Sequence, residues 1–185
     1  EQLTTKNVRH CVNSVSLVFQ PKPEDPAANT AIFAGGCFWG VEHLMKNMPG
    51  ILRIEPGYTG GHAEYPSYEQ VCTGQTGHAE AVRIVFDPQQ VSYETLVKGF
   101  MEIHDPTQSD GQGPDLGPQY RSEIFYTTDA QRQTALRVID LLKSKGHPVV
   151  TQVTPASVFW PAEDYHHRYY EQTGGVPYCH RRVKR

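Results

Sequence analysis

Residues 30–50 read TAIFAGGCFWGVEHLMKNMPG, and this stretch decides how the fold begins. The run AIFA at 31–34 is a short apolar segment of the kind that forms a buried strand, and two glycines end it. After Cys37, apolar side chains recur at the spacing of one helix face. These are Val41, Leu44, Met45 and Met48. The stretch therefore predicts a strand, a glycine turn and a helix that begins at Cys37 and ends at Pro49-Gly50.

Alternation of apolar and polar residues, together with turn signals, predicts the elements that follow. We expect strands over residues 51–58, 80–86, 122–126 and 149–154, and helices over residues 92–103, 128–146 and 161–172. Pro161 suits the first position of the last helix. Residues 57–67 and 104–119 are rich in Gly and Pro and should form loops. A loop as long as the second one is often functional in a compact domain.

The order of elements from Thr30 predicts the fold class. The first six match a split βαβ arrangement, in which helices cover one side of a mainly antiparallel sheet. We therefore expect an α+β fold, a two-layer α/β sandwich with a ferredoxin-like core and an irregular C-terminal segment. A doubly wound parallel sheet is the alternative, but the strand-to-strand step between residues 58 and 80 argues against it.

The domain should cover residues 30–185 and follow an extension at residues 1–29. The extension contains a candidate strand, Val12–Phe19, and a proline-rich linker at 21–26. At the other end, the basic stretch 180–185 is interpreted as a solvated tail.

Size and charge exclude several classes of protein. The chain has 185 residues, which corresponds to about one domain. Its net charge of −3 argues against a general nucleic-acid binder. No apolar run approaches the roughly 18 residues that a membrane span needs. The first 30 residues lack the pattern of a signal peptide. We expect a cytoplasmic monomer.

Cys37 is the first candidate for chemistry. A helix N-terminus presents unpaired N–H groups that favour an anion, so a cysteine there has a lowered pKa and reacts as a thiolate. The ordinary alternative is a buried structural cysteine. The strand, glycine turn and helix around Cys37 favour the nucleophile. Phe38 and Trp39 beside it would form an apolar wall, although such residues equally often pack in a core.

Acidic and phenolic side chains form the second set of candidates. Glu80 opens the strand 80–86, where an inward carboxyl would have a raised pKa and could donate a proton; a salt-bridged carboxylate at the strand end is equally compatible. Asp115 and Tyr120 lie where the long loop meets a strand, and Tyr68 lies in PSYE at 66–69. Spacing alone does not select either tyrosine.

The cysteines are too few for a disulfide-stapled domain, and no two are spaced as C-x-x-C. They are Cys11, Cys37, Cys72 and Cys179. They are interpreted either as reduced thiols or as one nucleophile with a distant resolving partner. His62, Cys72 and His78 could hold a metal only if the fold brought them together, so we expect no metal and no other cofactor.

Five motifs resemble the A-type peptide methionine sulfoxide reductases. They are GCFWG at 36–40, GYTGG at 57–61, GHAEAV at 77–82, QYRS at 119–122 and AEDYH at 162–166. The resemblance spans roughly residues 30–179, and the first motif is highly specific. It implies an α/β two-layer sandwich and makes residues 30–185 a catalytic domain.

The resemblance also implies a role for each candidate. Cys37 is the nucleophile, and Phe38 and Trp39 hold the substrate methyl group. The sulfoxide oxygen is hydrogen-bonded by three side chains: Glu80, which is also the acid, Tyr68 and Tyr120. Asp115 is a carboxylate that orients the site. Cys179 is the recycling cysteine.

The implied reaction is reduction of the S-epimer of methionine sulfoxide, free or in proteins, which repairs oxidised proteins. Thiolate attack leaves a sulfenic acid on Cys37, which condenses with Cys179 to a disulfide that thioredoxin or a similar dithiol reduces. Some relatives carry a further cysteine downstream, but none follows Cys179 here, which favours a two-cysteine cycle. The alternatives are a thiol peroxidase that uses the same cysteines and a redox sensor or methionine-binding module without turnover. Cys72 is expected to be structural, and Cys11 receives no role.

Overall fold

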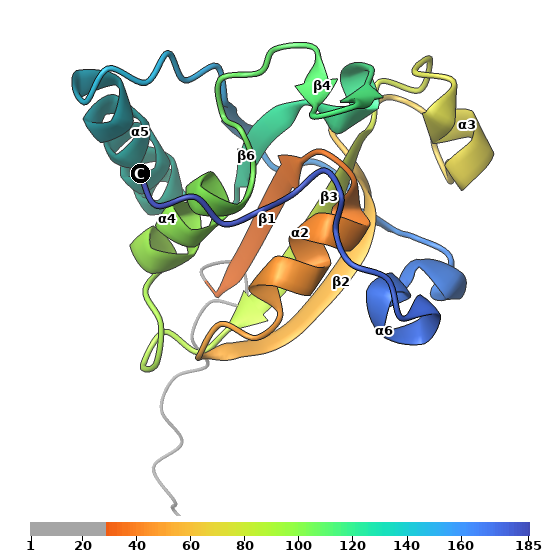
Figure 1. Cartoon of the computed structure of the whole chain (residues 1–185), viewed down its shortest axis with the longest axis horizontal. Helices are drawn as coiled ribbons and strands as arrows, with labels where there is room; N and C mark the ends of the chain where they lie inside the picture. The colour runs from red at the N-terminus through yellow and green to blue at the C-terminus, as the bar shows by residue number, and fades with distance from the viewer. Residues whose placement is uncertain (1–28) are drawn as a thin grey trace, which may run out of the picture.

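The computed structural model describes residues 29–185 (Figure 1). The expected strand Val12–Phe19, the linker and Cys11 lie outside the described residues. The strands of the main sheet are β1 (Thr30–Gly35), β2 (Ile51–Thr59), β3 (Ala79–Phe86), β6 (Ser122–Tyr126), β7 (Gln152–Pro155) and β8 (Trp160–Pro161). The helices are α2 (Phe38–Met45), α3 (Tyr68–Cys72), α4 (Tyr93–Ile103), α5 (Asp129–Ser144) and α6 (Tyr169–Thr173).

The six strands form one sheet in the order β7-β6-β1-β3-β2-β8. β1 runs antiparallel to β3 and β6, and β2 runs antiparallel to β3 and β8, while β6 and β7 are parallel. β3 therefore lies between β1 and β2, as a split βαβ unit requires. The expected α+β fold is confirmed, and the doubly wound parallel sheet is wrong.

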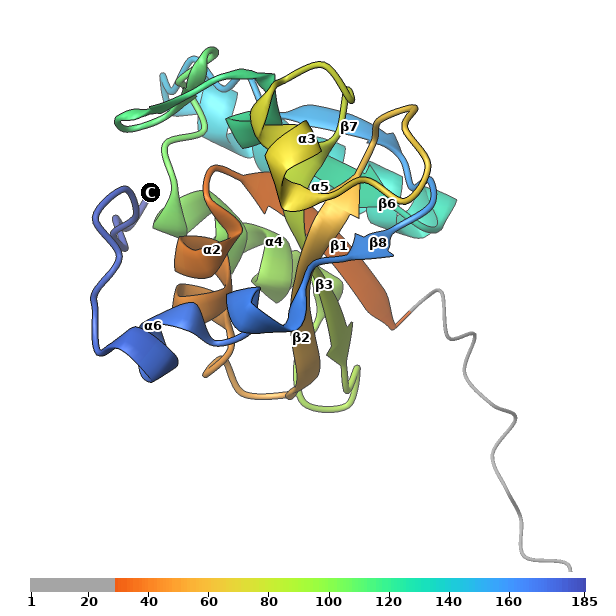
Figure 2. The ribbon, with the colours of Figure 1, turned by 90° about the vertical axis from the view of Figure 1, so that its right-hand side faces the viewer.

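Both faces of the sheet are covered. Phe33, Val82 and Ile84 face the main core, into which α2, α4 and α5 also bury apolar side chains (Figures 1 and 2). The alternate residues Ile32 and Ala34 face a second cluster, which segment 156–159 covers on the opposite side. Burial on both faces explains why residues 31–34 of β1 are all apolar.

A sharp turn joins β1 to α2. Gly36 has a φ of +93°, a left-handed conformation that glycine adopts without strain, and a side chain there would clash with Gln112, since a Cβ would lie 2.5 Å from that residue's Cβ. Cys37 is the N-cap, and its carbonyl accepts hydrogen bonds from the N–H groups of Gly40 and Val41. The helix ends at Met45, although Met48 still packs against the core.

The expected helix over residues 161–172 is wrong. Pro161 belongs to the edge strand β8, where proline is tolerated because one side of the strand has no partner to bond. A 3₁₀ turn, η2 (Asp164–His166), follows, and Arg168 with a φ of +51° separates it from the short helix α6. The strand expected over residues 149–154 is observed as β7, which begins three residues later and ends at Pro155.

Two elements appear in the expected loops. Ser67 opens α3 with a capping box that Gln70 completes. The long loop before β6 contains a hairpin of β4 (Gly111–Gln112) and β5 (Asp115–Leu116), followed by the 3₁₀ turn η1 (Pro118–Tyr120). No helix among residues 29–185 is long and apolar enough to cross a membrane.

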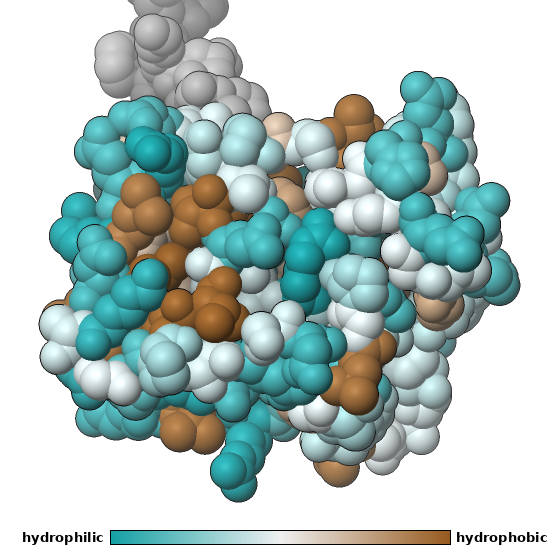
Figure 3. All heavy atoms as spheres, turned by 90° about the horizontal axis from the view of Figure 1, so that it is seen from above, coloured by the Kyte–Doolittle hydropathy of each residue, from teal (hydrophilic) through white to brown (hydrophobic). Residues whose placement is uncertain are grey.

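The C-terminal segment after α6 is irregular, as expected, and crosses over α2 and α4 (Figure 1). It is not simply a solvated tail. His180 is buried and lies 2.6 Å from the carbonyl oxygen of Gly35, measured from Nε2, and the N–H of Val183 donates to the carbonyl of Glu102. Seen from above, hydrophobic residues gather at the side of the molecule that carries α5, and the side that carries α3 is mainly hydrophilic (Figure 3).

Candidate active site

Two cysteines meet at the N-terminus of α2. The Cys37 and Cys179 side chains lie close enough for each to shift the pKa of the other, and both are free thiols. Cys37 is 6% exposed and Cys179 is 8% exposed. The backbone N–H of Trp39 points at the Cys37 sulfur. The fold therefore brings together two residues that are 142 positions apart in sequence (179 minus 37).

The two thiols shift each other's pKa in opposite directions. The hydrogen bond to Cys179, burial and the charge of Glu80 raise the pKa of Cys37 above its usual value. The hydrogen bond from Cys37, together with His180 and against the effect of burial, lowers the pKa of Cys179 to about 6. The N–H of Trp39 at the helix N-terminus lowers the pKa of Cys37, as expected, but Cys179, burial and Glu80 outweigh it.

Glu80 points into the same site from β3. It is 1% exposed, and its Oε2 accepts a hydrogen bond of 3.1 Å from the backbone N–H of Phe38. Burial raises the pKa of Glu80 to about 8, with smaller contributions from the charges of Asp115 and Cys179. The hydrogen-bond partner of Glu80 is thus a backbone N–H rather than a basic side chain. This favours the inward, protonated carboxyl over the salt-bridged carboxylate.

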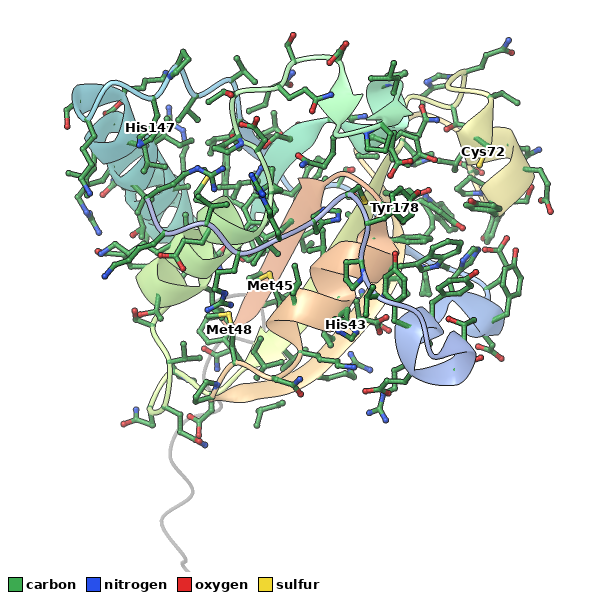
Figure 4. All side chains as sticks on the ribbon, viewed as in Figure 1. His43, Met45, Met48, Cys72, His147 and Tyr178 are labelled. Atoms are coloured by element: carbon green, nitrogen blue, oxygen red, sulfur yellow. The ribbon has the colours of Figure 1, made fainter. Side chains whose placement is uncertain are left out.

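Two phenols lie close to this carboxyl. Tyr68 is the first residue of α3, and Tyr120 is the last residue of η1. Burial, followed by the charge of Glu80, raises the pKa of both tyrosines. Both hydroxyls are therefore neutral hydrogen-bond donors beside Glu80. The Tyr68 hydroxyl also contacts the thiol of Cys72, which lies on the exposed side of α3 (Figure 4).

Phe38 and Trp39 occupy different positions. Phe38 is 1% exposed and packs in the core against Tyr58. Trp39 is half-buried and stacks on Tyr169, with 3.6 Å between ring centroids and 5° between planes. Its indole Nε1–H donates to Nδ1 of His166 over 2.9 Å. Trp39 therefore forms a wall of fixed orientation.

Asp115 connects β5 to the C-terminal segment. Its carboxylate accepts hydrogen bonds of 2.9 and 3.1 Å from the hydroxyl of Tyr178 and also contacts the thiol of Cys179. Tyr178 lies beside the turn from β1 to α2 (Figure 4). Asp115 thus contacts the Cys179 segment directly and affects Glu80 through its charge.

His78, one of the two histidines considered as metal ligands, has other partners. Both ring nitrogens of His78 bond backbone groups, the N–H of Gly61 and the carbonyl of Ala63. Within residues 29–185, no group of three or more His, Cys, Asp or Glu side chains is arranged to hold a metal ion.

The family model described as peptide methionine sulfoxide reductase matches residues 29–185. The chain belongs to this family. A relative, the peptide methionine sulfoxide reductase MsrA of Methanosarcina mazei, is 51% identical over 158 residues, which cover 84% of this chain and 75% of the relative. By this membership the chain is an oxidoreductase, a peptide-methionine (S)-S-oxide reductase.

Solved structures of the family share the fold. Reduced Mxr1 from Saccharomyces cerevisiae is 32% identical, covers 90% of this chain and 99% of its own, and has a TM-score of 0.79. Mxr1 in complex with Trx2 aligns over 90% of this chain and 99% of its own, at 22% identity and a TM-score of 0.57, and shows likeness of fold alone.

Sequence reasoning missed three residues that support this reductase site. His166 contacts Trp39, Tyr169 stacks on it, and Glu163 accepts hydrogen bonds from the Tyr68 N–H and the Tyr58 hydroxyl, at 2.9 and 2.8 Å. The motif AEDYH at 162–166 was the available signal for Glu163 and His166, and it does not include Tyr169. A single expected helix over that region concealed which side chains turn inward.

Proposed function

We propose that this reductase reduces the S-epimer of methionine sulfoxide, free or in proteins, by attack of the Cys37 sulfur on the sulfoxide sulfur. The observation that carries the proposal is the convergence of a cysteine, a buried acid and two neutral phenols. Glu80 accepts from the N–H of Phe38, the residue directly after Cys37, so acid and nucleophile are coupled through one backbone segment. Family membership supports the same reaction.

Three hydrogen-bond donors act on the sulfoxide oxygen. This oxygen is a poor leaving group and must be protonated or strongly hydrogen-bonded as its sulfur is attacked. Glu80, with a pKa of about 8, is largely protonated at neutral pH and supplies a proton. Tyr68 and Tyr120 donate hydrogen bonds to the same oxygen.

The substrate methyl group lies against Trp39, with Phe38 beneath it. An indole of fixed orientation offers apolar area that a methyl group can contact, while the groups on the opposite side donate hydrogen bonds to the oxygen. A site with an apolar side and a polar side distinguishes the two epimers, because exchanging oxygen and methyl would leave buried donors without a partner.

The first step transfers one oxygen atom. The Cys37 thiol and the sulfoxide become a sulfenic acid and the thioether of methionine, so the cysteine is oxidised by two electrons and the substrate is reduced by two. Cys179 then condenses with the sulfenic acid, which forms a disulfide and releases water. Contact between the two thiols in the reduced state supports this step.

A thioredoxin reduces the disulfide by thiol exchange and completes the cycle. The crystal structure of the yeast relative Mxr1 with Trx2 supports a partner of this kind. Asp115 orients the Cys179 segment through Tyr178. The cellular outcome is repair of oxidised methionine residues in proteins.

Turnover of stereopure methionine sulfoxides, free and in an unfolded protein, tests the proposal. We expect wild type to reduce the S-epimer alone with dithiothreitol, and Cys37→Ser to abolish this activity. Cys179→Ser should retain turnover with dithiothreitol and lose it with thioredoxin. Cys11→Ser is the matched control, because no role is assigned to Cys11. Reduction of hydrogen peroxide but of neither epimer by the folded enzyme would favour the thiol peroxidase instead.

A further inference from the structure

His180 forms a pair with Cys179. It is the next residue in sequence, is 5% exposed, and its Nδ1 lies 3.1 Å from the Cys179 sulfur. Its Nε2 lies 2.6 Å from the carbonyl oxygen of Gly35 at the end of β1. The imidazole therefore bridges the thiol of the C-terminal segment and the backbone beside Cys37.

The two contacts determine how the ring is protonated. A carbonyl oxygen only accepts hydrogen bonds, so Nε2 must carry a hydrogen. In the neutral ring Nδ1 is then the acceptor, and the hydrogen bond comes from the Cys179 S–H. When that proton moves to Nδ1, the same contact joins an imidazolium to a thiolate. Proton transfer therefore requires no rotation of the ring.

The fold is built to receive this ring. A Cβ on Gly40 would lie 2.2 Å from Nδ1 of His180, so the ring occupies the space that a side chain at position 40 would need. Gln112 holds the segment from the other side, because its Nε2 donates to the carbonyl of Cys179 over 3.2 Å. Its Oε1 accepts from the N–H of Asp105, which fixes the amide orientation.

We propose that His180 is the general base for disulfide formation, an inference that rests on the proposed sulfoxide reductase cycle. His180 removes the proton of Cys179, and the thiolate attacks the sulfur of the Cys37 sulfenic acid. The S–S bond forms as the S–O bond breaks, and the departing hydroxide takes the proton from the imidazolium to become water. The sum of one sulfenic acid and one thiol is one disulfide and one water, so no further oxidant is required.

Neighbouring charges act on this pair from several elements. His104 at the end of α4 interacts with the His180 ring, and Asp115 from β5 contacts the thiol of Cys179. A cavity of about 520 Å³ borders the pair on the outer side. The other charged residues that line this cavity are Asp105, Arg181 and Arg185. Cys37 from α2 faces the thiol directly. Any pH profile of disulfide formation reflects these groups as well as His180.

A single-turnover experiment separates the two chemical steps. Reduced enzyme is mixed with methionine (S)-sulfoxide without a reductant, and three quantities are followed: methionine released, sulfenic acid trapped by dimedone, and disulfide formed. We expect His180→Ala and His180→Gln to release methionine at the wild-type rate and to form the disulfide about 100-fold more slowly, within the range for general base catalysis. Trapped sulfenic acid should rise in parallel. His147→Ala, on the far side of the molecule by α5 (Figure 4), is the matched control.

The pH dependence distinguishes a base from a merely structural residue. Without the base, disulfide formation in His180→Ala should accelerate with pH, by about tenfold per unit below the ordinary thiol pKa, because only the thiolate attacks. The wild-type rate should change less over the same range.

Two results would overturn the inference. One is disulfide formation at the wild-type rate in both folded His180 variants. The other is disulfide formation that is slower in His180→Ala but keeps the wild-type pH profile. Absence of methionine release by wild type would instead overturn the proposed function, and with it the step on which His180 acts.

Discussion

The indole N–H of Trp39 donates to Nδ1 of His166 across 2.9 Å. Since an indole only donates, this nitrogen carries no proton, and His166 is the neutral tautomer with its hydrogen on Nε2. His166 Nε2 lies 3.7 Å from Oε2 of Glu163, which is beyond hydrogen-bond distance. Burial lowers the pKa of His166, which keeps the acceptor available at neutral pH. His166 thus fixes the orientation of the Trp39 indole, the wall proposed to contact the substrate methyl group.

Removing the acceptor should impair substrate binding. We expect His166→Leu to lower kcat/KM for methionine (S)-sulfoxide by about tenfold, because the indole N–H loses its partner in a half-buried site. His166→Asn should recover part of the loss, since its Oδ1 can stand near the position of Nδ1. Steady-state kinetics with dithiothreitol measure this, and His167→Asn at the neighbouring position is the control. Equal losses for the Leu and Asn variants would contradict a role through the Trp39 hydrogen bond.

Replacing the buried acid should change the pH profile. Glu80 donates only when protonated, so wild-type methionine release in a single turnover should fall as pH rises through about 8. Glu80→Gln keeps a hydrogen-bond donor but has no proton to give. We expect a rate lower by about 100-fold and without this pH-dependent fall. Chemical quench over pH 6 to 9 measures both properties, and an unchanged profile in the variant would refute the acid role.

The contrast between residues 30–45 and residues 160–173 shows what local sequence can predict. The strand–turn–helix at 30–45 was predicted because its periodicity reports burial of residues close in sequence. The η2 turn and α6 were mistaken for one helix because β8 and Glu163 receive their conformation from distant partners, β2 and Tyr68. No local pattern predicts such pairings.

The raised pKa of Cys37 escaped prediction for the same reason. A helix N-terminus favours a thiolate, and this was the only influence visible in the sequence. The opposing ones, Cys179 and Glu80, lie 142 and 43 residues away along the chain (179 minus 37 and 80 minus 37). The identities of the site residues could nevertheless be predicted. The sequence motifs contain these residues, although they do not give their arrangement in space.

A second buried acid should make stability depend on pH. Glu42 is 2% exposed, and burial raises its pKa to about 7, although it accepts the N–H of Arg168 over 2.8 Å. The folded state therefore holds this proton above the pH at which the unfolded chain releases it. Stability falls as pH rises from about 4.5 to 7, by at most about 3 kcal/mol. Urea unfolding should show a flatter dependence for Glu42→Gln, and Glu69→Gln serves as an exposed control. Parallel profiles for wild type and Glu42→Gln would contradict this assignment.

The close approach of His180 to α2 predicts an unusual effect for a helical glycine. Alanine at position 40 should favour the helix by about 1 kcal/mol through its intrinsic propensity. However, its Cβ would lie 2.2 Å from Nδ1 of His180, so the C-terminal segment must leave its place over the turn.

We therefore expect Gly40→Ala to retain its fold and its first release of methionine, while the Cys37–Cys179 disulfide forms at least about tenfold more slowly. Limited proteolysis should cut the segment after Gly175 faster than in wild type, because displaced segments are cleaved readily. Gly99→Ala is the matched control in α4, where a Cβ would meet only the flexible end of Met48 at 2.8 Å. A wild-type rate of disulfide formation in Gly40→Ala would show that the chemistry does not require His180 to pack against α2.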